Sequence, residues 1–314
     1  MKNVANVHVG VDISKAKLDI YLHPLEKKFI VSNDKTGFNK LAEKLLPYQV
    51  DSITCEASGG YETQMYRDFK KRGFNAQRVD PRRVKAFIKS EGIRIKTDAS
   101  DAKMIALFAA QKTMRYIPVE LTDEQIGQQA LVARKSDLVK MIAAEKTRLQ
   151  QVIDTYSKKS ITKHINFLDK QIVQIETLLA QSINLNEQQK CDAAILKTAP
   201  GVGIGVATTL IACCPELGKI SNKAMAALAG LAPYPRESGV YKGKSSIAGG
   251  RSYVRRMLYM AALSASHCAG PLKEFYDRLI AKGKKPKVAL VAVARKLIVF
   301  LNAMLRKQEE WKIA

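Results

Sequence analysis

The chain has little of what thiolate metal proteins, disulfide-bonded proteins and zinc hydrolases contain. Its five cysteines are odd in number and scattered, and none forms a C-x-x-C pair, which argues against a disulfide framework or a zinc site. The four histidines lie far apart and lack the H-E-x-x-H spacing of zinc hydrolases. We therefore expect a protein of a reducing cytoplasm.

Long apolar runs and acidic residues are also scarce. No apolar run approaches the ~20 residues of a membrane span, and the N-terminus lacks the apolar core of a signal peptide. Against 52 Lys and Arg residues stand only 29 Asp and Glu residues, a formal net charge of +23. Such an excess suits a polyanionic partner. Nucleic acid is thus a stronger candidate than a membrane surface.

The 314 residues suffice for about two domains, and the first part has an α/β pattern. Alternating apolar residues predict three consecutive strands within 4–32. Helical and strand patterns then alternate: helix 36–48, strand 51–57, helix 59–73 and strand 74–80. This order of elements is that of the ribonuclease-H-like fold, in which the first and fourth strands lie side by side.

Residues 121–186 have almost no glycine and no proline, and their apolar residues recur at three- and four-residue spacing. Such seams are typical of a coiled coil. The polar segment 157–160 between them predicts either the turn of an antiparallel hairpin or an exposed stretch of one long rod. Two bundle helices packed on a domain fit equally well. The seam residues are Leu131, Leu138, Ile142, Leu149 and Val152, then Ile161, Ile165, Leu168, Ile172, Ile175 and Leu179.

The C-terminal part is predicted to be mainly helical, with helices in 195–215, 252–266 and 286–307. The turn at 199–207 lacks the G-x-G-x-x-G spacing of dinucleotide sites, and a helix precedes it where a strand is required. A helix-hairpin-helix turn suits it better, with backbone N–H groups near Gly201 and Gly203 holding a DNA phosphate. A tight turn between core helices is the structural alternative.

A long loop rich in Pro, Gly, Ser and Lys follows the small-residue helix that begins at 222. Flexible cationic loops of this kind usually bind phosphate. Three serines lie in it, but spacing identifies no base that would activate one. The candidate phosphate-binding residues are Arg236, Lys242 and Lys244, with Arg251 and Arg255 on one helical face and Arg256 beside them.

Four acidic residues lie at informative places in the N-terminal part. Asp12 ends the first predicted strand and Glu56 ends the fourth, while Asp98 and Asp101 open a helix within 97–110. In a ribonuclease-H-like sheet the first two would be neighbours, and a helix across the sheet would add the others. Converging carboxylates repel unless a cation neutralises them, which favours a Mg²⁺ site. Alternatively, these acids cap turns and complement a helix dipole, with Thr97 as cap.

Several segments together resemble a known family. VGVDISKAKLD, CEASGGYE, KTDASDAKMIA, LKTAPGVGIGVATTLIA and LAGLAPYPRESG…KGKSSIAGGRSYVRRMLYMAA resemble the DEDD transposases of bacterial insertion sequences. That family includes bridge-RNA-guided recombinases and pilin-gene invertases. The resemblance implies a RuvC-like domain over 1–118, a coiled-coil dimerisation segment over 119–190, and a C-terminal transposase domain over 191–314 that carries a catalytic serine.

The resemblance also implies roles for individual residues. The catalytic, Mg²⁺-binding tetrad falls on Asp12, Glu56, Asp98 and Asp101. The serine falls on Ser238, in the S-G step between the A-P-x-P and K-G-K-x-x-I-x-x-G-G elements, with Ser245 and Ser246 as alternatives. Ser238 would attack the scissile phosphate. A dimer or tetramer with composite sites, and a structured guide RNA that selects target and donor DNA, are further implications.

Three functions follow from these observations. The leading one is a DNA recombinase that cuts and rejoins strands through a covalent serine link. The second is a RuvC-like structure-specific nuclease that hydrolyses DNA with the tetrad alone. The third is a non-catalytic nucleic-acid scaffold whose acids are structural. A functional tetrad would exclude the third, and a required Ser238 would separate the first from the second.

Overall fold

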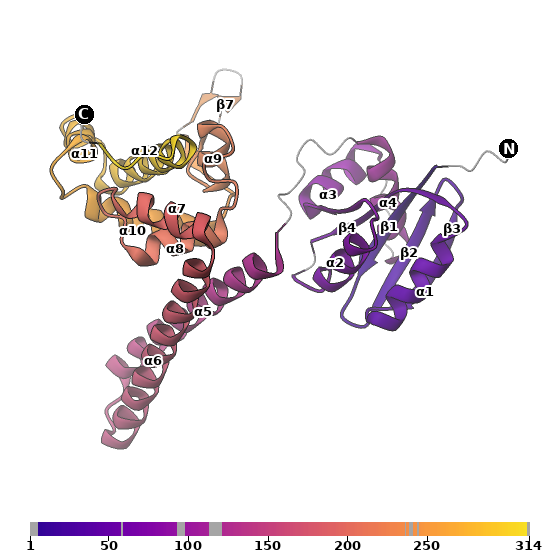
Figure 1. The fold of residues 1–314 in the computed structure, drawn as a ribbon, viewed down its shortest axis with the longest axis horizontal. Helices are drawn as coiled ribbons and strands as arrows, with labels where there is room; N and C mark the ends of the chain where they lie inside the picture. The colour runs from indigo at the N-terminus through magenta and orange to yellow at the C-terminus, as the bar shows by residue number, and fades with distance from the viewer. Residues whose placement is uncertain are drawn as a thin grey trace. The chain divides into compact units, whose positions relative to one another are not determined.

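The chain forms two compact units, residues 1–118 and 119–314, which we describe separately (Figure 1). The computed structural model describes residues 6–57, 59–92, 98–112, 121–235, 237–238, 241–243 and 245–312.

The first unit is built on a five-stranded mixed sheet with the strand order β3-β2-β1-β4-β5. The first three strands form an antiparallel meander, and β4 and β5 run parallel to β1. The first and fourth strands therefore adjoin, as the sequence predicts, while the RuvC-like assignment stays a prediction. The strands are β1 (Asn6–Ile13), β2 (Lys17–His23), β3 (Lys27–Ser32), β4 (Gln49–Glu56) and β5 (Ala76–Val79).

Helices cover both faces of this sheet. Because side chains alternate along β1, the buried Val9 and Val11 pack on one face with α1 (Lys35–Leu45) and α2 (Thr63–Lys71). The other face, on which Gly10 lies, is covered by α4 (Asp98–Gln111). The remaining helix, α3 (Pro81–Ser90), packs on α4.

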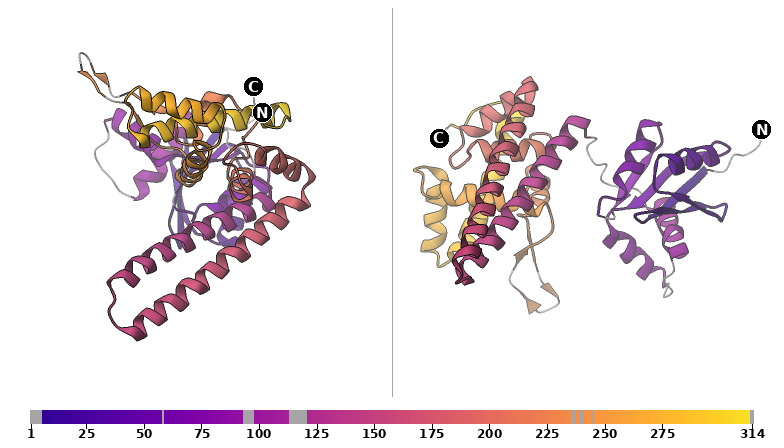
Figure 2. Two further views of the ribbon diagram at one scale, coloured as in Figure 1. Left: turned by 90° about the vertical axis from the view of Figure 1, so that its left-hand side faces the viewer. Right: turned by 90° about the horizontal axis from the view of Figure 1, so that it is seen from below.

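The second unit begins with a long antiparallel helical hairpin, α5 (Asp123–Gln151) and α6 (Thr155–Leu185). Figure 2 shows the hairpin extending from the helical body of the same unit. Its direction is fixed by paired side chains: Lys135 bonds Glu176 at 2.6 Å near the body, and Glu145 approaches His164 at 3.3 Å nearer the tip. The predicted apolar seams face each other within one chain.

The turn of this hairpin is not where the polar segment 157–160 suggested. Residues 152–154 form the turn, and 157–160 lie in the first turns of α6. The reason is the cap: the Asp154 carboxylate accepts the Ser157 backbone N–H at 2.7 Å, so the helix begins at Thr155. The antiparallel hairpin was one of the alternatives left open by the sequence, and the turn position suggested for it was wrong.

Six further helices enclose one apolar core that also takes in the root of the hairpin through Val132, Leu179 and Ile183. The helices are α7 (Glu187–Lys197), α8 (Ile204–Cys213), α9 (Asn222–Leu228), α10 (Ser252–Ala265), α11 (Pro271–Ala281) and α12 (Pro286–Lys307).

The last helix corrects the expectation that no apolar stretch approaches membrane length. By length and composition, α12 could span a bilayer, with a mean hydropathy of 2.0 over its most apolar window. However, 56% of that window is buried, with Val293, Leu297 and Leu301 fully enclosed in the helical core. The apolar composition of α12 therefore reflects its central position in this unit.

The predicted loop after α9 contains regular pairing, which we call the β-arm (residues 233–247). Pro233–Tyr234 (β6) pairs with Ser246–Ile247 (β9), and Glu237–Ser238 (β7) pairs with Tyr241–Lys242 (β8), both antiparallel. The innermost recorded pair joins Ser238 to Tyr241.

Candidate active site

Asp12 and Glu56 lie next to each other on one face of the sheet. Parallel pairing of β1 with β4 sets Val11 opposite Cys55, and the two acids each follow one residue later. Both therefore share the face of Gly10 and Thr54, the preceding pair of the same parity. Both are half-buried. The sheet thus brings Asp12 and Glu56 together, although they lie far apart in the sequence.

Gly10 lets α4 approach this same face. A Cβ at Gly10 would overlap the Ala102 carbonyl oxygen and lie 2.5 Å from the Ala106 amide nitrogen, so only glycine fits here. On α4, Asp101 directly precedes Ala102 and is half-buried. Asp98 is the first residue of α4, and its side chain lies outside the described residues. The structure therefore places the helix that carries the last two acids against the strand that carries the first.

A fifth carboxylate on this face was missed by the sequence analysis. Asp19 on β2 is the cross-strand partner of Asp12, and Tyr21, two residues on, packs against Ala102 of α4. Asp19 is 14% exposed and forms an ion pair with Lys17 at 3.1 Å. The register that sets Asp19 opposite Asp12 is fixed by the short turn after Asp12, which closes with a hydrogen bond from the Ser14 N–H to the Lys17 carbonyl.

The donor set of this face suits Mg²⁺, which prefers oxygen ligands. Asp12, Asp19 and Glu56, near the strand ends, all offer carboxylate oxygens. The Thr54 hydroxyl, two residues before Glu56, is fully buried and has no hydrogen-bond partner among the described residues. Cys55 points to the opposite face, and burial raises the pKa of its thiol to about 12. Within the described ranges no three acidic, histidine or cysteine side chains lie at metal-binding distance, and Asp98 is outside that search.

The predicted nucleophile lies on the β-arm of the second unit. Ser238 is on β7, and its side chain, like that of Lys242 on β8, is outside the described residues. Arg236 and Lys244 are outside the described residues altogether. Ser245 and Ser246 are both exposed. The structure therefore gives the backbone pairing of Ser238 and leaves its role as a prediction.

Two of the predicted phosphate-binding arginines lie at the root of this arm. Arg251 holds Glu216 through two hydrogen bonds of 2.6 and 2.7 Å, and Glu216 is only 2% exposed. The hydrogen bonds that Arg251 donates to Glu216 raise the pKa of the Arg251 guanidinium. Arg255 donates to the backbone carbonyls of Gly230 and Gly249, at 3.2 and 2.8 Å. Arg255 thus joins the two ends of the arm, and Arg251 ties the end of the arm to the buried Glu216.

The glycine turn between α7 and α8 is shaped by packing. Gly201 has a φ of +77°, and a Cβ there would overlap the Ala261 carbonyl oxygen of α10. Gly203 is the N-cap of α8 and offers no side chain to bond the first amides. Lys135 lies beside Gly205 and is paired with Glu176. The close contact with α10 supports the structural alternative, and the phosphate-binding role of this turn stays a prediction.

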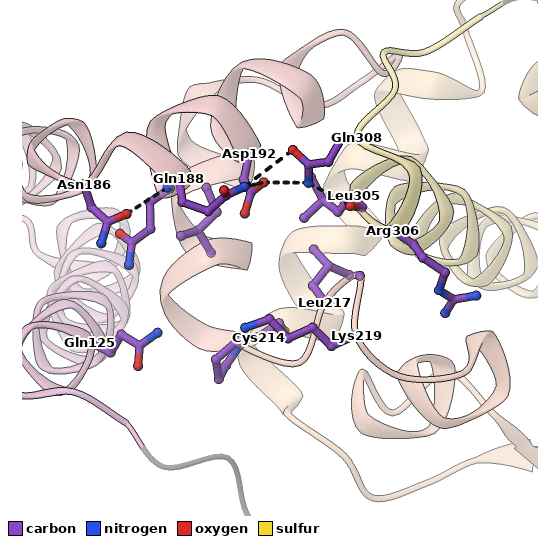
Figure 3. Close-up of a pocket in the computed structure, with 14 residues that line it drawn as sticks. Gln125, Asn186, Gln188, Asp192, Cys214, Leu217, Lys219, Leu305, Arg306 and Gln308 are labelled. Carbon is purple, nitrogen blue, oxygen red and sulfur yellow. Dashed lines mark hydrogen bonds between the residues drawn. The ribbon is translucent and has the colours of Figure 1, made fainter.

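A cavity of about 540 Å³ lies elsewhere in the second unit, between α5, α7, α8 and α12 (Figure 3). Amide side chains dominate its wall: the Gln308 amide donates to Asp192 at 3.1 Å, and Gln188 donates to the same carboxylate at 2.9 Å. None of the predicted site residues is among those that line it. The cavity is therefore separate from the candidate active site.

Neighbouring strands that end in carboxylates, in a strongly basic chain, are suited to an enzyme that acts on nucleic-acid phosphates. Comparison with known families agrees. A model described as "Transposase", for the DEDD transposases of IS110 elements, matches residues 9–158, and a second, "Transposase IS116/IS110/IS902 family", matches residues 193–277. The protein is a transposase, an enzyme of DNA recombination. The chain belongs to the IS110/IS116/IS902 family.

Individual relatives agree with this assignment. The chain is 27% identical to the pilin gene-inverting protein of Moraxella lacunata over 97% of each chain. It is 31% identical to the uncharacterized IS116 protein of Streptomyces clavuligerus, over 55% of this chain and 44% of that one. It is 32% identical to the IS1111A transposase of Coxiella burnetii, over 34% of this chain and 28% of that one.

Proposed function

We propose that this transposase cuts and rejoins DNA through a covalent link to Ser238, assisted by Mg²⁺ at Asp12, Glu56, Asp98 and Asp101. The observation that carries the proposal is the register of β1 and β4, which puts Asp12 beside Glu56 on the face that α4 covers. If the four acids served only as turn caps, Asp12 and Glu56 would not need to lie side by side on neighbouring strands.

Mg²⁺ bound there would supply positive charge to the phosphate and to the oxygen atoms that enter and leave it. The carboxylates of the tetrad would hold the ion, and the α4 contact at Gly10 would keep Asp101 at the sheet. Asp19, already paired with Lys17, would remain beside the tetrad as part of the charge balance of this face.

In the serine step the Ser238 Oγ forms a bond to phosphorus and loses its proton, and the bond from phosphorus to one deoxyribose oxygen breaks. That oxygen takes a proton and leaves as a hydroxyl. Rejoining is the reverse reaction with a different DNA hydroxyl, which frees the serine. The phosphodiester energy is kept in the serine ester, so the step needs no nucleotide cofactor.

The basic side chains of the β-arm would hold the DNA next to the serine. Arg236 shortly precedes Ser238 in the sequence, Lys242 and Lys244 shortly follow it, and cationic groups offset phosphate charge. Arg251 and Arg255 would act from the root of the arm, where they are bonded to the protein as well. The turn at Gly201 and Gly203 would add backbone N–H groups.

We further propose that a structured bridge RNA selects the target and donor DNA, that the active form is a dimer or tetramer, and that the enzyme works in the bacterial cytoplasm. The net charge of +23 supports more than one nucleic-acid partner. The α5–α6 seam is closed within the chain, so a contact between protomers would use outer residues of the hairpin, where Phe167 and Leu178 are exposed.

The decisive experiment looks for a DNA adduct that survives detergent denaturation. We expect it in the natural protein, its loss in Ser238→Ala, and its persistence in the matched variants Ser245→Ala and Ser246→Ala. Asp12→Asn should abolish strand cleavage while DNA binding persists, because one tetrad carboxylate is neutralised without loss of basic surface.

Three outcomes would change the proposal. An adduct lost only in Ser245→Ala or Ser246→Ala would keep the reaction and move the nucleophile. Cleavage in Ser238→Ala with no adduct in any variant would establish the hydrolytic nuclease instead. Full recombination by Asp12→Asn would exclude the tetrad. RNA guidance is tested by sequencing the RNA that copurifies with the protein. One structured species would support it, and a random mixture would contradict it.

A further inference from the structure

The end of the second unit carries a basic surface that the candidate site does not include. Between Arg278 and Gln308 the sequence has nine Lys and Arg residues and no Asp or Glu. Three of the lysines lie in the short connection between α11 and α12, a fourth is the second residue of α12, and all residues from 281 to 288 are exposed. We call these four the basic turn: Lys282, Lys284, Lys285 and Lys287.

Some other exposed lysines of this unit have an acidic partner. Lys140 pairs with Asp137 at 2.8 Å, Lys190 with Glu187 at 3.3 Å, and Lys273 with Asp277 at 2.6 Å. Within the described ranges no ion pair involves a lysine of the basic turn. Lysines that serve solubility are usually interspersed with acids. Here the positive charge is left uncompensated.

The backbone of the turn is fixed by hydrogen bonds. The Gly283 N–H bonds the Ile280 carbonyl at 2.8 Å, and the Lys284 N–H bonds the Leu279 carbonyl at 3.1 Å, with Gly283 at a φ of +73°. This is the Schellman ending of a helix. Pro286 then occupies the first turn of α12, where its fixed φ favours helix initiation. The lysines therefore extend from a defined path, and binding needs little ordering of the backbone.

Helix α12 adds to the positive potential of this surface. It has 22 residues, starts at Pro286, and has no acidic residue in its first turn, so its positive dipole end is not offset there. Two large apolar side chains near the turn are partly exposed, Val288 at 55% and Ile280 at 37%, beside four exposed lysines. A surface on which the cations outnumber these apolar side chains suits a phosphate backbone better than a lipid bilayer or an apolar protein partner.

We propose that the basic turn binds the phosphate backbone of duplex DNA, in addition to the contacts made at the β-arm. This inference rests on the proposed function in that the duplex is the enzyme's DNA substrate. The contact is independent of base sequence, because lysines on a turn meet phosphates as point charges. Its role is to hold the duplex outside the region where strands are cut.

The test compares two triple variants that lose the same charge. The first is Lys284→Gln, Lys285→Gln and Lys287→Gln in the basic turn. The control is Lys140→Gln, Lys190→Gln and Lys273→Gln, which removes three lysines that are already paired with acids. Affinity for a short duplex of random sequence is measured over a range of salt concentrations, with thermal melting as a check on folding. All six side chains are exposed, so both variants should fold.

We expect the basic-turn variant to bind duplex DNA at least about tenfold more weakly than the control at moderate salt. The slope of log affinity against log salt should fall by roughly 2 to 3, since each lost phosphate contact removes about 0.9. Equal affinity and equal slope in the two triples would overturn the inference. So would a loss confined to structured RNA, with duplex binding unchanged.

Failure of this inference can be told apart from failure of the proposed function. If the natural protein forms no serine adduct but the basic-turn variant still loses duplex affinity, the DNA surface stands and the covalent mechanism is wrong. If the adduct forms and the basic-turn variant binds duplex as the control does, the mechanism stands and the surface is wrong.

Discussion

The two units present their candidate functional residues on very different supports. In the first unit, Asp12 and Glu56 stand on adjacent strands inside a five-stranded sheet, under a helix that contacts Gly10 directly. In the second unit, Ser238 stands on a strand of two residues that pairs only with another strand of two residues. The carboxylates are thus supported by a packed sheet core, and the serine by an arm.

The difference fits the division of work in the proposed mechanism. A metal-binding cluster needs ligands held within a fraction of an ångström, which a sheet provides. A nucleophile that leaves and rejoins DNA strands is suited to an arm whose position is set at its root. At that root a Cβ on Gly250 would overlap the Gly230 backbone, and a Cβ on Gly230 would overlap the Gly249 carbonyl oxygen. Arg255 donates to the carbonyls of Gly230 and Gly249.

The largest effect is expected in the hairpin of the second unit. Leu168 is 3% exposed and faces α5. The double variant Leu168→Asp, Ile172→Asp places charge in the seam and should lower the free energy of unfolding by about 3 kcal/mol or more. The matched control is Phe167→Asp, because Phe167 is adjacent in sequence and 58% exposed. Helical circular dichroism during urea unfolding measures both variants.

The oligomeric state of the same double variant sharpens the result. A protein that keeps its full helical signal and becomes monomeric by light scattering would mean that the seam pairs between protomers, contrary to the packing within one chain. Dissociation of Phe167→Asp without loss of helix would instead place the contact between protomers on the outer face.

A smaller effect is expected at the helix–sheet contact of the first unit. Gly10→Ala forces α4 away from β1 and should destabilise this unit by about 1–3 kcal/mol, with loss of Mg²⁺-dependent cleavage. Gly127→Ala on α5 is the control, because a Cβ there meets nothing within 4 Å. The single tryptophan, Trp311, packs on Phe300 in the second unit, so its fluorescence transition should not move in Gly10→Ala. An unchanged stability of Gly10→Ala would mean that α4 does not lie on β1.

Sequence reasoning worked where patterns are long. The strands of the first unit and its helices other than α3 followed from alternation and amphipathic spacing, and the adjacency of Asp12 and Glu56 followed from strand order. Two residues of this site were missed for local reasons. Gly10 stands within a valine-rich strand, where a glycine signals close approach, and Asp19 becomes a neighbour of Asp12 only through the hairpin register.

Prediction was weaker in the second unit, where local chemistry decides. The β-arm has strands of only two residues in a segment rich in Pro, Gly and Ser, so its composition indicates a loop. The hairpin turn lies at 152–154 because one side chain, Asp154, caps α6. From the sequence alone, Arg251 and Arg255 were expected to be available for phosphate. Their partners in the structure, Glu216 and Gly230, lie at least 25 residues away and could not be foreseen from local sequence.

The smallest effect expected is a change in acid stability at this cap. Backbone N–H bonding by Ser157 lowers the pKa of the exposed Asp154 carboxyl below its usual range. A lowered pKa in the folded state means that the charged cap stabilises the hairpin above the ordinary carboxyl pKa, and that this contribution is lost as pH falls through the folded value. Asp154→Asn keeps an acceptor for the Ser157 N–H and removes the charge. We therefore expect the variant to match the natural protein in strong acid and to be slightly less stable near neutral pH, measured by urea unfolding followed through helical circular dichroism.

Asp34→Asn is the counterpart in the first unit, where the Gly37 N–H lowers the carboxyl pKa in the same way. If each variant changes the pH dependence of its own unit alone, the two units unfold independently. A shift in Trp311 fluorescence caused by Asp34→Asn would show that their stabilities are coupled.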